Sequence, residues 1–118
     1  MQAIRKPVRR LVRASRCSLA GLRCALREEA FRLELFVSAI LAPLAFFMTS
    51  DGVERVLLIA AIGLVLITEV LNTAIERAVD RIGLENHKLS RDAKDLGSAA
   101  VFISILLAAL IWGMVLTL

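Results

Sequence analysis

The fold is decided by residues 68–98, which read TEVLNTAIERAVDRIGLENHKLSRDAKDLGS. The first part of this stretch extends an uncharged apolar run, residues 56–68, so a helix that starts in hydrocarbon continues into a polar segment. Because each helical residue turns by ~100°, Glu69, Asn72 and Glu76 share one helix face. A carboxylate inside a membrane segment is costly unless it faces protein or water, so Glu69 is predicted to be functional.

A second polar segment follows in the same stretch. The loop at residues 83–92 turns the chain back, and Lys94, Gly97 and Ser98 then open the next apolar helix, with Asp95 beside them. Two antiparallel helices would bring the polar side chains of both segments together. The predicted cluster consists of Glu69, Asn72, Glu76, Lys94, Asp95 and Ser98.

The composition indicates a small membrane protein. The chain has 118 residues, and 58% of them are hydrophobic. These residues are gathered into runs that meet the length of a bilayer, and a single domain of this size has too little polar surface to cover them. We therefore predict an all-α membrane protein with one domain, residues 1–118.

The positive charge is concentrated near the N-terminus. Residues 1–32 hold nine of the lysines and arginines, and the formal net charge is +4. A single aromatic residue accompanies them, and no nucleic-acid recognition motif is present, so anionic lipid headgroups are the expected partner and nucleic acid is not. The two cysteines, Cys17 and Cys24, lie two helical turns apart, ~10 Å, too far for an easy disulfide.

Residues 4–27 are predicted to form an amphipathic helix that lies in the membrane interface. One stripe of this helix is apolar and the opposite face is basic, which is typical of interfacial helices. The apolar stripe contains Ile4, Val8, Leu11, Val12, Leu19, Leu22 and Leu26.

Three membrane helices are predicted after it, at about residues 30–48, 54–82 and 93–117. The first is short for a span of ~20 residues. Ser90 or Asp92 is the expected N-cap of the third. Lysine and arginine flank the N-terminus and the loop at 83–92, whereas the first loop holds only Arg55. By the positive-inside rule, the N-terminus faces the cytoplasm and the C-terminus lies outside a cell (inner) membrane.

The depths of the two glutamates suggest a site that meets both water and lipid. Glu76 precedes Arg77 and is expected near the cytoplasmic interface, and Glu69 lies seven residues deeper, ~10 Å. Carboxylates suit Mg²⁺, which usually takes one or two of them plus phosphate oxygens. The phosphate loops and catalytic motifs of soluble kinases are missing, so these residues alone do not identify ATP.

Three sequence motifs resemble the bacterial integral-membrane diacylglycerol kinase family. They are EVLNTAIERAVDRIG at residues 69–83, SRDAKDLGSAAV at 90–101, and GLRxAxxExAFR at 21–32. The resemblance covers nearly the whole chain from Arg10 onward. It implies a homotrimeric bundle that transfers the γ-phosphoryl group of MgATP to diacylglycerol, making phosphatidic acid.

The resemblance also implies roles for individual residues. Glu69 would accept the proton of the lipid hydroxyl, and Glu28 and Glu76 would hold Mg²⁺. The family has a tyrosine near the nucleotide where this chain has Cys17, so Cys17 is left out of the site. The implied ATP contacts are Arg10, Glu28, Glu76, Glu85, His87, Lys94 and Asp95, and the implied lipid contacts are Arg10, Glu69, Asn72, Ser98 and Trp112.

Other acidic and basic residues are expected to be structural or solvated. Asp80, beside Arg81, is expected to be structural, and His87 is as consistent with a solvated loop residue as with a ligand contact. Glu29 and Glu34 are expected at the headgroup level or in water. The remaining alternatives are an undecaprenol kinase, a small ion-coupled transporter and a non-enzymatic membrane subunit.

The spacing of Arg10 and Glu28 predicts that sites are shared between copies of the chain. The two residues are 18 positions apart, ~27 Å on an unbroken helix, so one such helix cannot bring both to one phosphate chain. Either the helix breaks near Gly21 or the two residues serve different sites.

Overall fold

The computed structural model describes all 118 residues and consists of helices alone. Three of the helices are long and apolar enough to cross a membrane, which confirms the predicted class of an all-α membrane protein. The four helices are α1 (Gln2–Ala25), α2 (Glu29–Met48), α3 (Gly52–Ile82) and α4 (Lys88–Thr117), of which α2, α3 and α4 are the candidate spans.

The helix boundaries agree with the predicted ones except near two connections. The helix α1 is continuous through Gly21, so the break toward α2 lies at residues 26–28 instead. The helix α4 begins at Lys88, earlier than predicted, and its N-cap is His87 rather than Ser90 or Asp92. The imidazole Nδ1 of His87 accepts a hydrogen bond from the backbone N–H of Leu89 at 3.1 Å, an acceptor role that the sequence analysis did not assign to it.

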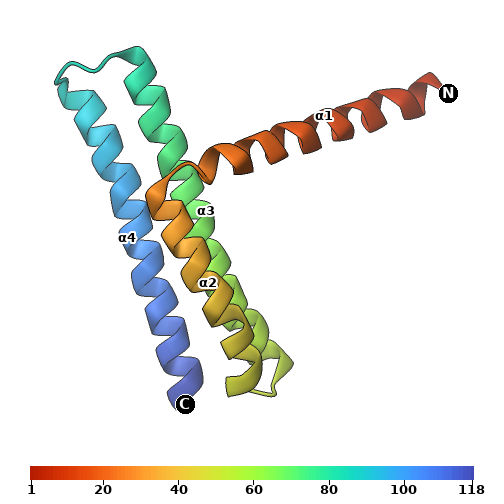
Figure 1. The fold of residues 1–118 in the computed structure, drawn as a ribbon, viewed down its shortest axis with the longest axis vertical. Helices are drawn as coiled ribbons and strands as arrows, with labels where there is room; N and C mark the ends of the chain where they lie inside the picture. The colour runs from red at the N-terminus through yellow and green to blue at the C-terminus, as the bar shows by residue number, and fades with distance from the viewer.

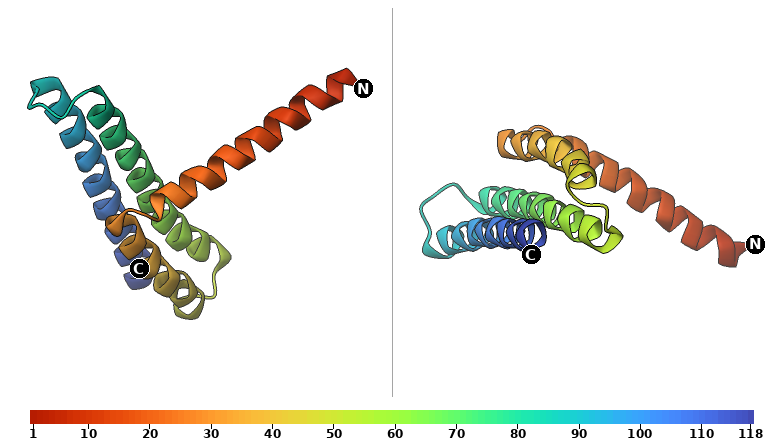
Figure 2. Two further views of the ribbon diagram at one scale, coloured as in Figure 1. Left: turned by 45° about the horizontal axis from the view of Figure 1, so that its top comes forward. Right: turned by 90° about the horizontal axis from the view of Figure 1, so that it is seen from below.

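The bundle is built on an antiparallel pair, α3 and α4, with α2 packed against α3. Figure 2 shows α2 lying along one side of this pair. The connection between α3 and α4 lies at one end of the bundle, and the C-terminus lies at the other, beside the turn between α2 and α3 (Figure 1). The helix α1 projects away from the bundle from a corner that lies partway along α3 (Figure 1). Every residue of α1 before Cys24 is exposed, so the apolar stripe of this helix is uncovered in the single chain.

Two hydrogen bonds join α3 to α4 inside the apolar region. The hydroxyls of Thr68 and Ser104 lie 2.8 Å apart, and the indole N–H of Trp112 donates to the carbonyl of Leu58 at 3.0 Å. Small residues let the two helices approach closely, as is common in membranes. Gly97 is one such residue, which is buried and faces the side chain of Asn72 on α3.

The turn between α2 and α3 is stabilised by hydrogen bonds from its own polar side chains. The carboxylate of Asp51 caps α3 by accepting from the backbone N–H groups of Val53 and Glu54. The guanidinium of Arg55 donates to the carbonyls of Thr49 and Phe46, both at 2.9 Å, which satisfies free carbonyls at the end of α2. This turn therefore fixes the antiparallel register of α2 and α3.

The single chain has little interior of its own. Only 11 of the 118 residues are buried, and many large apolar side chains are exposed on α2, α3 and α4. Such a surface is unsuited to water, because large exposed apolar patches mark contacts with membranes or other proteins. Lipid and other protein chains are therefore the natural environment of the bundle.

The topology can be tested with single cysteines at Asp51 and Asn86, in a background that lacks Cys17 and Cys24. The two positions lie in connections at opposite ends of the bundle, so they should react with a membrane-impermeant thiol reagent from opposite sides. Labelling from inside-out and right-side-out vesicles measures this. Labelling of both positions from the same side would rule out three spans.

The close approach at Gly97 predicts an unequal effect of two matched substitutions on one helix. A Cβ at Gly97 would overlap the side chain of Asn72, whereas a Cβ at Gly113 meets nothing within 4 Å. Overpacking of this kind typically costs about 1–3 kcal/mol. We expect Gly97→Ala to lower the thermal unfolding midpoint in detergent and Gly113→Ala to leave it unchanged or raise it. Equal midpoints for the two variants would contradict this packing.

Candidate functional site

An ion pair marks the level at which α1 and α2 meet α3. Glu28, at the N-cap of α2, accepts a hydrogen bond from Arg77 at 2.7 Å, and Arg77 also donates to the Sγ of Cys24 at 3.0 Å. Figure 1 shows that α3 and α4 continue past this corner. If α1 lies in the membrane interface, the charged residues beyond Arg77 project out of the hydrocarbon and into water.

Glu69 lies below this level, within the apolar part of the bundle. It is eight residues before Arg77, ~12 Å along the helix axis. Its side chain is buried, with 8% of its surface exposed. Burial among protein side chains spares this carboxyl group the cost of facing lipid.

The carboxyl group that faces Glu69 belongs to Glu34 on α2. Glu34 is half-buried, and no hydrogen-bond donor reaches its buried Oε2 atom. The expectation that Glu34 is solvated or lies at headgroup level is therefore wrong. The reason is the register of the antiparallel pair: Glu28 is level with Arg77, so Glu34 comes level with the buried turn of α3 that contains Glu69.

Asn72 and Glu76 form the next layer of the site. The amide of Asn72 donates to Oε1 of Glu76 at 3.3 Å, and the amide oxygen of Asn72 is buried without a partner. Gly97 fills the position on α4 that faces them, while Asp95 and Ser98 are exposed. The single chain therefore brings Asn72 and Glu76 together but does not turn Asp95 and Ser98 toward them.

Lys94 contacts α3 through a carboxylate that lies outside the predicted cluster. Its ammonium forms an ion pair with Asp80 at 2.6 Å, so the expectation of a structural role for Asp80 is met by a contact across the two helices. Lys94 also lines a hollow of about 230 Å³ under the α3–α4 connection. Glu85 and His87, two of the predicted nucleotide contacts, line the same hollow.

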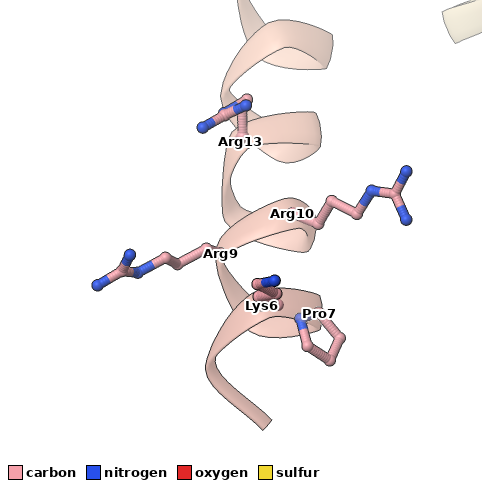
Figure 3. Close-up of a pocket in the computed structure, with 5 residues that line it drawn as sticks. All are labelled: Lys6, Pro7, Arg9, Arg10 and Arg13. Carbon is pink, nitrogen blue, oxygen red and sulfur yellow. The ribbon is translucent and has the colours of Figure 1, made fainter. Parts of the chain in front are cut away.

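Arg10 is separated from the rest of the predicted site. It lies on α1, which projects away from the bundle (Figure 1). Figure 3 shows that the groups around it, from Lys6 to Arg13, belong to α1 alone, and that the side chains of Arg9 and Arg10 point to opposite sides of the helix. Within one chain, Arg10 and Glu76 therefore do not form one site.

The residues predicted to hold metal supply suitable oxygen donors but no complete cage. No group of three or more histidine, cysteine, aspartate or glutamate side chains is assembled in the chain. Mg²⁺ needs only one or two carboxylates when phosphate oxygens complete its shell. Glu76, with the unpartnered oxygen of Asn72 one turn away, fits such a partial set, whereas Glu28 is engaged by Arg77.

An apolar groove runs from Glu34 toward the far end of the bundle. It has a volume of about 300 Å³ and lies between α2, α3 and α4. Trp112 forms part of its wall while its N–H group is occupied by Leu58. The lining residues are Leu33, Glu34, Val37, Ser38, Leu41, Ile62, Val65, Ile105, Ala108 and Trp112.

The sequence was compared with known proteins and protein families. Residues 16–116 match the family described as prokaryotic diacylglycerol kinase. A diacylglycerol kinase from Haemophilus influenzae is 46% identical over 107 residues, which are 90% of this chain and 91% of that protein. The diacylglycerol kinase of Escherichia coli K12 is 47% identical, over 87% of this chain and 85% of its own length.

A third relative matches over a similar length. The diacylglycerol kinase of Pseudomonas aeruginosa is 44% identical over 110 residues, 92% of this chain and 89% of that protein. Family match and relatives together cover α2, α3, α4 and most of α1. The chain is a multi-pass membrane protein that belongs to the prokaryotic diacylglycerol kinase family.

Proposed function

We propose that the chain phosphorylates diacylglycerol with MgATP at the cytoplasmic face of the inner membrane and releases phosphatidic acid and ADP. One observation carries this proposal: Glu69 is a buried carboxyl group in the apolar part of α3, about two turns below a water-facing set of charged residues. A lipid alcohol can reach the buried end, and a soluble nucleotide can reach the charged end. Membership of the family supports the choice of substrates.

In the proposed reaction, Glu69 accepts the proton of the lipid hydroxyl. As this proton leaves, the hydroxyl oxygen forms a bond to the γ-phosphorus of ATP, and the bond from that phosphorus to the β–γ bridging oxygen breaks. Phosphoryl transfer depends mainly on positioning and on stabilising charge, and both suit a site with few reactive side chains. Asn72 is placed one turn above Glu69 to orient the reacting groups.

The charged end of the site would hold the polyphosphate. Glu76 is our first candidate for a Mg²⁺ ligand, and Glu28 is a second candidate once its ion pair with Arg77 opens. The metal would neutralise phosphate charge, as it does in other phosphoryl-transfer enzymes. Lys94 would bind phosphate oxygens while Asp80 keeps its side chain in place. Glu85, His87 and Asp95 would contact the nucleotide.

We further propose that the working unit is a homotrimer with shared sites. One chain leaves the apolar stripe of α1 and much of the bundle surface uncovered, and it leaves Arg10 on the part of α1 that projects away from the bundle. A second copy could supply Arg10, cover these surfaces and add walls around Glu69. The resemblance carried by the sequence motifs implies a composite assembly of this kind.

The roles of the two glutamates predict different defects. Glu69→Gln keeps the shape of the side chain and removes the base, so turnover should fall by about 10²–10⁴-fold while MgATP binding persists. Glu76→Gln should instead raise the Mg²⁺ and MgATP concentrations needed for half-maximal rate. Lipid phosphorylation by purified protein in mixed micelles measures both.

The same assay decides which lipid alcohol is the substrate. Diacylglycerol and undecaprenol are supplied separately, and a faster reaction with undecaprenol would replace the proposed substrate. If Glu69→Gln retained most of its turnover, the assignment of the base would be wrong. ATP consumption that does not depend on any lipid alcohol would favour a different class of membrane protein.

Shared sites predict complementation between two inactive chains. Arg10→Ala and Glu69→Gln chains are unfolded together, refolded into lipid and assayed for lipid phosphorylation. Some mixed interfaces regain an intact set of residues, so part of the activity should return. Cross-linking confirms that mixed oligomers have formed, and activity no higher than that of the separately refolded variants would then contradict sharing.

A further inference from the structure

Glu34 is a half-buried acidic residue that has no part in the mechanism described so far. It lies on α2, six residues beyond Glu28, ~9 Å along the helix. The pairing of Glu28 with Arg77 places this part of α2 opposite the turn of α3 that holds Glu69. The shared lining of the apolar groove agrees, because Glu34 and Val65, one turn from Glu69, border the same space.

The surroundings of the two carboxyl groups do not allow both to be charged. Glu69 is buried, and one oxygen of Glu34 is buried with no donor in reach. The nearby groove is lined almost entirely by apolar side chains, and no lysine or arginine lines it. Two carboxylates that face each other in such a place repel, and desolvation adds to the cost, so one proton is held between them. With that proton, the pair becomes a hydrogen bond between a carboxylic acid and a carboxylate, which is strong.

We infer that Glu34 is a positioning residue for Glu69: it carries the shared proton and donates it in a hydrogen bond to the Glu69 carboxylate. This inference rests on the proposed role of Glu69 as the base. A base must be ionised to accept the hydroxyl proton, so within the pair the resident proton belongs on Glu34. The bond would also fix the orientation of the Glu69 carboxylate, and it leaves the second oxygen of Glu69 free for the lipid hydroxyl.

The inference explains why α2 carries a glutamate at this depth. An apolar side chain at position 34 would leave the buried Glu69 carboxylate without this donor, and the carboxylate would lose the hydrogen bond that orients it toward the lipid hydroxyl. A glutamine at position 34 would keep a donor of similar shape. The two substitutions should therefore have opposite outcomes although both remove the acidic group.

The experiment compares Glu34→Gln and Glu34→Leu with a control on the same helix. Ser38→Ala is the control, because Ser38 lines the same groove while its hydroxyl is occupied by the backbone carbonyl of Glu34 at 2.6 Å. We expect Glu34→Gln to keep kcat within about threefold of the parent and Glu34→Leu to lose about 10- to 100-fold, as for the loss of a hydrogen bond to a charged group. The KM for diacylglycerol should change little in either, and Ser38→Ala should resemble the parent.

A spectroscopic readout tests the position of the proton without turnover. Infrared spectra of the protein in lipid should contain the carbonyl absorption of a protonated carboxylic acid, and this absorption should disappear in Glu34→Gln. Its persistence in Glu34→Gln together with its loss in Glu69→Gln would place the proton on Glu69 and overturn the inference. Thermal unfolding of Glu34→Leu and Glu34→Gln in lipid provides the folding control, because a loss of turnover counts only for a variant that is still folded at the assay temperature.

The kinetic outcomes separate this inference from the proposed function. Full turnover in Glu34→Leu, or equal losses in Glu34→Gln and Glu34→Leu, would overturn the role of Glu34 while leaving Glu69 as the base if Glu69→Gln is inactive. Full turnover in Glu69→Gln would overturn the proposed base itself, whatever the Glu34 variants do.

Discussion

The constraint on which this structure depends is the burial of a carboxyl group in hydrocarbon. Glu69 interrupts an otherwise apolar part of α3, and lipid cannot solvate it. Protein must therefore surround it, and α2 and α4 supply two of the walls. The shape of the bundle follows from this need, because α3 is the helix that both of the other spans contact.

The remaining polar groups in the membrane region are satisfied within the bundle or lie beside the site. The Thr68–Ser104 bond holds α3 to α4 one residue from Glu69, and the Trp112–Leu58 bond holds the two helices together farther from the charged end of the bundle. They occupy groups that would otherwise be exposed to hydrocarbon, which is how polar side chains contribute to helix association in membranes. By contrast, the amide oxygen of Asn72 and Oε2 of Glu34 are left without partners, and both lie next to the proposed reaction path.

Helix types and boundaries were largely predictable because runs of apolar residues and their charged borders are local signals. The face shared by Glu69, Asn72 and Glu76 followed from helical periodicity in the same way. The pairing of residues on different helices was not predictable from periodicity. Glu34 was expected in water or at headgroup level, and only the register between α2 and α3 shows that it faces Glu69.

A similar limit applies to Arg77, Lys94 and the N-cap of α4. Arg77 engages Glu28 and Cys24, which are about fifty positions away in sequence, and no local pattern links them. Lys94 contacts Asp80 because the connection between α3 and α4 is short. That connection is short because His87 caps α4 with its own imidazole and starts the helix at Lys88. The antiparallel register could have suggested each of these pairs once one of them was known.

The unequal lengths of the spanning helices make the site sensitive to membrane thickness. The 20 residues of α2 measure ~30 Å, which matches the hydrocarbon core of an ordinary bilayer, whereas the 31 residues of α3 measure ~46 Å. The shortest span, α2, limits the bilayer thickness that the bundle matches. In a thicker bilayer, either the lipid thins around α2 or the charged ends of α3 and α4 come to lie closer to the acyl chains. Either response changes how deep Glu76 and Lys94 lie relative to the headgroups. The acyl-chain length of the surrounding phospholipids therefore affects how readily a water-soluble nucleotide and a lipid alcohol can meet at the site.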